Sequence, residues 1–172
     1  MKNSKNIIIS IISLIGVLVL FSAVFLLMKN EKLTDKNSVS VYFVKSKDKT
    51  YFKIAPVKRK ISPDKSRIST AITELLKGPD EKEQKEGFYT EIPDSTKLIR
   101  IIETPKNITL NLSEDFESGG GSTSMNTRLR QLINTSLDAA KNKSVYLELN
   151  GKKVDMIGGE GVIVTQPLSR PE

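Results

Sequence analysis

The chain has 172 residues, with 27 basic and 20 acidic side chains and with no histidine and no cysteine. Without these two residue types the usual general base, the thiol nucleophile and most zinc sites are excluded, and no cofactor is expected. Positive and negative charges alternate closely, as in "DEKEQKE" at 80–86. Such interleaving is typical of a solvated surface and argues against a nucleic-acid partner.

The first element in chain order is an apolar run at 7–28, which holds 22 residues without a charge. As a helix it would be roughly 33 Å long, enough to cross a bilayer core. It is longer than the apolar part of a signal peptide and is followed by no small-residue cleavage site. Since there is no cysteine, a lipid anchor of the lipoprotein type is excluded. The run therefore predicts a single-pass transmembrane helix.

This helix divides the chain into a short tail at 1–6, the anchor at 7–28, a polar linker at 29–38 and one domain at 39–172. Lysines flank the run almost evenly on both sides, so they decide its orientation only weakly. We expect the N-terminus inside and the domain outside the cytoplasm. Residues 31–172 carry about four more basic than acidic side chains, which leaves a modest attraction to anionic polymers possible.

In the first half of the domain, alternating apolar residues predict strands at 39–46 and 51–61, joined by a turn at 48–50. Pro56 has no N–H to donate, so the second strand is expected at an edge of its sheet or bulged there. A helix is expected to begin at Ser62, with Pro63 in its first turn, and to stop at Gly78. Its apolar positions recur at helical spacing.

In the second half, 80–96 is expected to be a solvated turn and an irregular segment whose apolar residues dock on the core. Strands at 97–103 and 107–112 form a hairpin around "TPKN". Ser122 or Thr123 is expected to cap a long helix that ends near Lys141. Asn150 and Gly151 predict a tight hairpin turn, with Val154 and Met156 alternating on the return strand. The prolines near the end speak against regular structure there.

The order strand–strand–helix, repeated, and then two more strands predicts the fold class. Each helix has one apolar stripe, and both stripes are buried if the two helices lie on one face of a single sheet. We therefore expect an α+β two-layer sandwich, a mixed β-sheet with two helices packed on one face, in addition to the N-terminal transmembrane helix.

The glycine stretch within "SEDFESGGGSTSM" (113–125) raises the question of a phosphate loop. A P-loop requires a lysine beside its serine or threonine, and a dinucleotide-binding turn follows a buried strand. Here the segment before the glycines is acidic, and no lysine stands beside the serine and threonine that follow them. We interpret the glycines as a mobile entry into the helix and as a contact surface.

Other catalytic patterns are weak. "SPDK" at 62–65 matches the spacing of a Ser-Lys pair, but the serine is better used as a helix cap. Glu114 and Asp115 are adjacent in sequence and point apart on a strand end, so they do not form a glycosidase pair by themselves. The spacing of the acids in "SEDFE" is not that of a calcium loop.

Taken in order, several segments resemble the GerMN domain, a sporulation and spore germination domain of bacteria, from about Val39 to Arg170. They are "VYFV", "IAPVKRKI", "ELLKGP", "EGFYTEIPDSTKL", "LNLSEDF", "VYLELNGKKV" and "PLSR". The resemblance implies an extracytoplasmic domain tethered to a bacterial membrane, without assigned catalytic residues. It also implies a fold similar to ring-building motifs. The chain departs from lipoprotein members of the family because it has no cysteine.

Three hypotheses follow. The first is a non-enzymatic, membrane-tethered scaffold that binds envelope proteins or its own copies. The second is a binding module for peptidoglycan or another anionic wall polymer. The third is an envelope hydrolase that uses Glu114 or Asp115, which the missing histidine and cysteine disfavour. The possible interaction surface comprises Lys58, Arg59, Lys60, Gly119, Gly120 and Gly121.

Overall fold

The computed structural model describes residues 37–48 and 51–170. Within these residues no helix combines the length and the apolar character needed to cross a bilayer. The predicted anchor at 7–28 and most of the linker lie outside the described residues. The strands are β1 (Ser38–Asp48), β2 (Tyr51–Lys60), β3 (Phe88–Tyr89), β4 (Leu98–Glu103), β5 (Asn107–Leu112), β6 (Ser144–Leu149), β7 (Lys152–Lys153), β8 (Met156–Ile157) and β9 (Val162–Ile163). The helices are α2 (Arg67–Lys77), α3 (Glu81–Lys85), a 3-10 turn η1 (Glu114–Glu117) and α4 (Ser122–Ala140).

The protein has a mixed α+β fold, but its strands form three sheets and not the single sheet expected from the sequence. The orders are β2-β1-β3, β4-β5-β6-β7 and β8-β9. The pair β5–β6 is parallel and its neighbours are antiparallel, so the second sheet is mixed as predicted. Period-2 patterns identify strands, but they do not say which strands share hydrogen bonds, because that choice depends on contacts distant in sequence.

The two predicted hairpins, β4–β5 and β6–β7, are present. Pro56 lies on β2, an edge strand, where its missing N–H costs no ladder hydrogen bond. The turn between β6 and β7 has Asn150 and Gly151 at φ 48° and 78°, as a type I′ turn requires. The return strand is shorter than predicted. It ends after two residues, so Val154 is buried whereas Met156 starts β8 with 59% exposure.

The first long helix begins later than predicted. Ser66, not Ser62, is the N-cap of α2, and its hydroxyl accepts a hydrogen bond from the Ser69 N–H at 3.2 Å. The carbonyl of Ser62 instead closes a turn with the N–H of Lys65. The predicted stop is correct, because Gly78 follows the last helical residue with φ +78°. Several serines can cap equally well by type, so local chemistry alone did not select the right one.

A short helix, α3, replaces the turn expected after Gly78. Asp80 caps it, and Asp80 and Glu83 exchange side chain-to-backbone hydrogen bonds in a capping box. The predicted docking of the following segment is confirmed for Phe88 and Ile92, which are 7% and 4% exposed, but not for Tyr89, which is 38% exposed. The segment is also not wholly irregular, since Phe88 and Tyr89 form β3. The capping box is visible in the sequence as an aspartate followed three residues later by a glutamate, and it was the missed signal.

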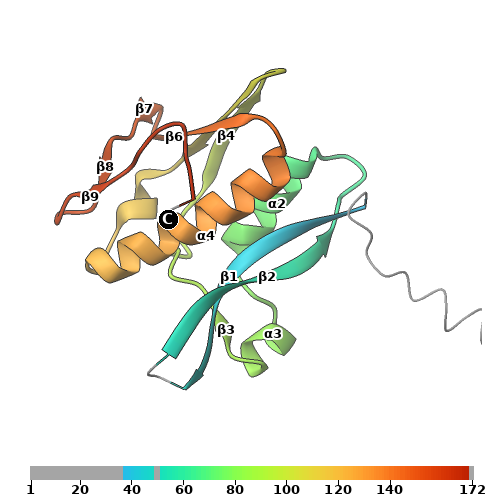
Figure 1. The fold of residues 1–172 in the computed structure, drawn as a ribbon, viewed down its shortest axis with the longest axis vertical. Helices are drawn as coiled ribbons and strands as arrows, with labels where there is room; N and C mark the ends of the chain where they lie inside the picture. The colour runs from blue at the N-terminus through green and yellow to red at the C-terminus, as the bar shows by residue number, and fades with distance from the viewer. Residues whose placement is uncertain (1–36, 49–50, 171–172) are drawn as a thin grey trace, which may run out of the picture. The chain divides into compact units, whose positions relative to one another are not determined.

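The core lies where α2 and α4 meet each other and the strands. Both helices contact β1, while α2 also reaches β4 and α4 also reaches β6. Figure 1 shows α4 crossing the domain with β1 on one side of it and β6 on the other. The apolar stripe of α2 is buried at Ile68, Ala71, Ile72 and Leu75, as its spacing predicts.

The C-terminal segment is ordered by side-chain contacts with β6. The Gln166 amide accepts a hydrogen bond from the Leu147 N–H at 2.8 Å and donates to the Leu147 carbonyl at 2.9 Å. Two residues on, the Leu168 N–H donates to the Val145 carbonyl at 2.7 Å. This segment therefore lies along β6 where the short β7 has ended. It forms no helix or strand at 164–170, as its prolines predicted.

Candidate functional site

The glycine segment is built around a buried arginine. Arg128 of α4 is 3% exposed, and its guanidinium donates to the carbonyl oxygens of Phe116, Ser118 and Gly119 at 2.8, 3.1 and 3.0 Å. A further bond at 3.0 Å reaches the Ser124 hydroxyl. Burial lowers the pKa of Arg128 from its usual range. The loop thus turns carbonyl oxygens inward toward a cation, an arrangement that anchors it on α4.

The N-terminus of α4 is occupied by a carboxylate from a distant turn. Glu160 accepts a hydrogen bond from the Ser122 N–H at 2.8 Å, and hydrogen bonds from the side chain and then the backbone of Ser122 lower the pKa of Glu160. The predicted cap by Ser122 or Thr123 is wrong, because the N-cap residue is Gly121 and makes no side-chain cap bond. Glu160 takes the position that an anion would use at this helix end.

Two of the three predicted contact glycines have left-handed backbones. Gly119 and Gly120 have φ of +66° and +75°, and a Cβ at Gly120 would lie 2.7 Å from Cβ of Ser124. All three glycines, including Gly121, are exposed. Glycine at 120 is therefore explained by backbone conformation and by the close approach to α4. Whether these residues contact a partner stays a prediction.

A fully buried amide, which sequence reasoning missed, joins α4 to two other segments. The Gln131 side-chain oxygen accepts from the Glu91 N–H at 3.0 Å, and its nitrogen donates to the Tyr42 carbonyl at 3.3 Å and to the Thr90 hydroxyl at 3.1 Å. On the same edge of β1, the Tyr42 N–H donates to the Thr135 hydroxyl at 2.9 Å. Side chains of α4 thus satisfy backbone groups of β1 that β3 is too short to pair. Gln131 lies on the side of the helix opposite the predicted apolar stripe, and this side is buried as well, so no local sequence signal indicated its role.

The basic run on β2 divides between two faces, as the alternation of a strand requires. Arg59 forms two hydrogen bonds of 2.6 Å with Glu83 and lies 3.4 Å from Glu74. Its side chain is 16% exposed, and the hydrogen bonds with Glu83 raise the pKa of Arg59 and lower that of Glu83. Lys58 and Lys60 are exposed. The structure therefore commits Arg59 to α2 and α3, and the predicted basic surface retains two cations.

Of the two acids considered for a hydrolase, Asp115 has a structural contact, as does the neighbouring Glu117. Asp115 accepts a hydrogen bond from the Ser113 hydroxyl at 2.9 Å, and Glu117 accepts one from the Gly158 N–H at 3.1 Å. Glu114 lies at a pocket of about 310 Å³ beside the β6–β7 turn. In the described ranges, no group of three or more His, Cys, Asp or Glu side chains is arranged to hold a metal ion.

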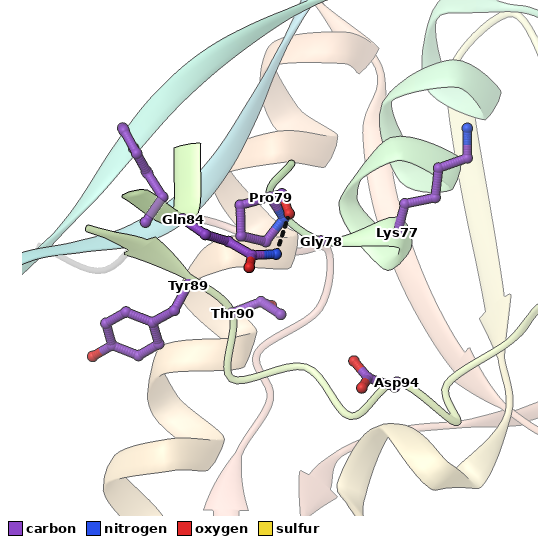
Figure 2. Close-up of a pocket in the computed structure, with 8 residues that line it drawn as sticks. Lys77, Gly78, Pro79, Gln84, Tyr89, Thr90 and Asp94 are labelled. Carbon is purple, nitrogen blue, oxygen red and sulfur yellow. Dashed lines mark hydrogen bonds between the residues drawn. The ribbon is translucent and has the colours of Figure 1, made fainter. Parts of the chain in front are cut away.

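A pocket of about 380 Å³ opens beside the end of α2 (Figure 2). The residues that line it are Lys77, Gly78, Pro79, Gln84, Phe88, Tyr89, Thr90 and Asp94. The Gln84 amide nitrogen donates to the Pro79 carbonyl at 2.9 Å, which fixes the orientation of that side chain. Figure 2 shows the Asp94 carboxylate directed toward the pocket and the Lys77 side chain directed away from it. Burial, and then the charge of Glu91, raise the pKa of Tyr89.

These features define a small α+β domain with open pockets, in which Arg128 anchors a loop and Glu160 meets a helix end. The chain belongs to the family described as "Germane: Sporulation and spore germination", whose sequence profile matches residues 40–155. The match extends from β1 past β7, so it covers most of the described fold. The resemblance to the GerMN domain is thereby confirmed.

Similar proteins agree with this assignment. The chain is 28% identical over 146 residues to the "Spore germination protein GerM" of Bacillus subtilis (strain 168), and the match covers 81% of this chain but 38% of that protein. It is similar to the tandem GerMN domains of the sporulation protein GerM from Bacillus subtilis, with a TM-score of 0.60, 26% identity, and coverage of 78% of this chain and 44% of the other.

The first GerMN domain of the same protein aligns with a TM-score of 0.60 and 15% identity, over 78% of this chain and 98% of that domain. This last similarity concerns the fold alone. Family membership supports a role related to sporulation, and none of these similarities indicates a catalytic family.

Proposed function

We propose that this protein is a non-enzymatic interaction module of the bacterial cell envelope that acts in spore formation or germination. In this proposal the apolar run at 7–28 holds the chain in the cell membrane, and the domain lies outside the cytoplasm, where it binds envelope proteins or further copies of itself. The single observation that carries the proposal is the profile match over 40–155 to a sporulation and germination family.

One property of the described residues agrees with an interaction role. Several of their carboxylates, those of Glu83, Asp115 and Glu160, are engaged with an arginine, a hydroxyl group and a helix end. Binding of a wall polymer stays a prediction. It concerns Lys58 and Lys60, the two cations of the basic run that are exposed on β2.

Membrane topology is the first test. One reporter that is active only outside the cytoplasm and one that is active only inside are each fused after Glu172. The proposal requires the outside reporter to be active and the inside reporter to be silent. The opposite result would remove the envelope partners, and would leave the family assignment as a statement about the fold.

Partner binding is the second test. A photo-reactive residue is placed at Lys60 on β2 or at Ser118 in the glycine loop, and cross-linking is carried out in sporulating cells. The same residue at Lys106, in the turn between β4 and β5, controls for capture by chance. A defined partner or oligomer from the first two positions is expected. If neither position yields more than the control, the scaffold function is refuted for these surfaces.

A further inference from the structure

We propose that Asn150 is a site of spontaneous deamidation, and that Asn111 slows this modification in the folded protein. The proposal concerns the turn between β6 and β7 and is independent of the proposed function. Asn150 is the only asparagine in the sequence that is followed by glycine. Because glycine has no side chain, its backbone nitrogen can approach the preceding asparagine side chain with the least hindrance. The sequence therefore places a reactive pair at 150–151.

The reaction needs no reagent other than water. The Gly151 nitrogen attacks the side-chain carbonyl carbon of Asn150, and the side-chain nitrogen leaves as ammonia, carrying the proton that Gly151 has lost. The product is a cyclic imide, which water opens at either carbonyl. One opening gives aspartate, and the other gives isoaspartate, in which the main chain runs through the former side chain. One water is consumed and one ammonia is released, with no oxidation or reduction.

The side chain of Asn150 is accessible, whereas the attacking nitrogen is engaged. Asn150 is exposed and lies at the pocket of about 310 Å³ beside the β6–β7 turn. The Gly151 N–H donates a hydrogen bond of 2.9 Å to the side-chain oxygen of Asn111. Asn111 is 6% exposed, so this acceptor is fixed in the sheet and shielded from water. An N–H that donates to such an acceptor is harder to deprotonate, because the hydrogen bond stabilises the neutral form.

The geometry of the turn also opposes the reaction. Asn150 and Gly151 have φ of 48° and 78°, and in a type I′ turn the second nitrogen is turned away from the first side chain. Attack therefore requires rotation of the peptide between them, which breaks the hydrogen bond to Asn111. The Asn150 N–H donates to the Leu112 carbonyl at 2.9 Å. Asn111 and Leu112 are neighbours on β5, so the end of this strand holds both N–H groups of the turn.

Deamidation would alter the turn in two ways. A carboxylate at 150 adds a negative charge at a pocket that already contains Glu114 and Glu117. Isoaspartate also lengthens the main chain by a methylene group, which the tight two-residue turn does not accommodate. We therefore expect isoaspartate to separate Lys152 and Lys153 from β6, with which they pair in the unmodified chain.

The test follows deamidation of the purified full chain in nonionic detergent at mildly alkaline pH. Trypsin releases residues 144–152 as one peptide, in which Asn150 is the single side-chain amide, and mass spectrometry measures its conversion into an acid. The folded chain is expected to react several-fold more slowly than the chain unfolded by guanidinium chloride. Asn150→Gln is the assay control, because its longer side chain must close a larger ring and should give almost no product.

Three variants decide whether Asn111 slows the reaction. Asn111→Leu removes the acceptor and is expected to speed deamidation about fivefold, the factor that one hydrogen bond corresponds to. Asn111→Asp keeps an acceptor oxygen and is expected to retain the slow rate, which a merely structural role of the amide would not explain. Thr109→Val, two residues away on the same face of β5, is the matched control and should leave the rate unchanged.

Near-ultraviolet circular dichroism checks that each variant is folded, and Asn111→Ser, too short to reach the Gly151 N–H, takes the place of Asn111→Leu if the latter unfolds. A fast leucine or serine variant beside a slow aspartate variant supports the proposal. Equal rates in the folded and the unfolded wild type overturn it, as does a variant without the acceptor that reacts no faster than wild type. An unfolded chain that forms no acid at 150 would refute the modification site itself.

Discussion

The strongest stability prediction concerns Gln131→Leu. Leucine has nearly the volume of glutamine, so the change removes hydrogen bonds without opening a large cavity. The change leaves the Glu91 N–H without its acceptor and the Tyr42 carbonyl without its donor. The Gln131 side chain that bonds these two groups in the wild type is fully buried. The Thr90 hydroxyl keeps a bond of 3.1 Å from the Ile92 N–H.

The magnitude follows from the two backbone groups left unpaired. Each buried, unsatisfied group costs about 1–3 kcal/mol, which amounts to roughly 2–6 kcal/mol for both. The leucine side chain returns about 1 kcal/mol through apolar burial. We therefore expect the free energy of unfolding to fall by about 3 kcal/mol. Domains of this size are stable by about 5–15 kcal/mol, so the variant should still fold.

The assay is unfolding of the full chain by urea in nonionic detergent, followed by near-ultraviolet circular dichroism and analysed by linear extrapolation. The control is Asn126→Leu, which also replaces an amide by leucine but at an exposed position of α4, where the amide bonds the Ser122 carbonyl of its own helix. It should cost no more than about 0.5 kcal/mol. A loss below about 1 kcal/mol for Gln131→Leu would show that these backbone groups find other partners. The reasoning from buried, unpaired groups would then be refuted.

Three further predictions test the charged and phenolic groups. Arg128→Met removes the donors to the carbonyls of Phe116, Ser118 and Gly119. It should lower the free energy of unfolding by about 2–4 kcal/mol and speed amide hydrogen exchange over 116–121. Unchanged exchange would contradict the anchoring role of Arg128. Glu83 has a lowered pKa because of its hydrogen bonds with Arg59, so it stabilises the fold above the ordinary value of 4.5 and loses this effect as the pH falls through its lower folded pKa. The difference in free energy of unfolding between wild type and Glu83→Gln should therefore be present at neutral pH and vanish in acid; a constant difference would disprove the linkage. Burial, and then the hydrogen bond and charge of Asp138, raise the pKa of Tyr42 to about 12 from its ordinary value of 10.0. The free energy of unfolding should therefore decline as the pH rises from about 10 to about 12. Tyr42→Phe should remove both this decline and one alkaline step in the ultraviolet titration.

Local chemistry explains why most elements were predictable. Alternating apolar residues identified β1 and β5, Gly78 identified the end of α2, and Asn150 with Gly151 identified the β6–β7 turn. Each of these signals acts within a few residues of chain. Where several residues offer the same chemistry, as at the start of α2, the choice of Ser66 over Ser62 depends on where the preceding strand must end, and the prediction was wrong.

The candidate sites were less predictable, because their parts come from distant segments. The basic run at 58–60 was recognised, but nothing near it in sequence indicated that Arg59 pairs with Glu83. The acidic segment before the glycines argued against a phosphate loop, yet the sequence did not reveal that Arg128 holds that segment. The pocket beside α2 joins the end of one helix to residues up to 94, and only their approach in space makes it visible.

The sequence by itself determined the type of nearly every long element, the family, and the lack of histidine and cysteine chemistry, because periodicity, turn residues and composition are local properties. The tertiary structure alone decided how the strands divide into three sheets and which polar side chains are buried. It also decided that Glu160 meets the start of α4. Hydrogen-bond pairing over long sequence separations depends on the packing of the whole core, and a residue's own neighbours in the chain do not encode it.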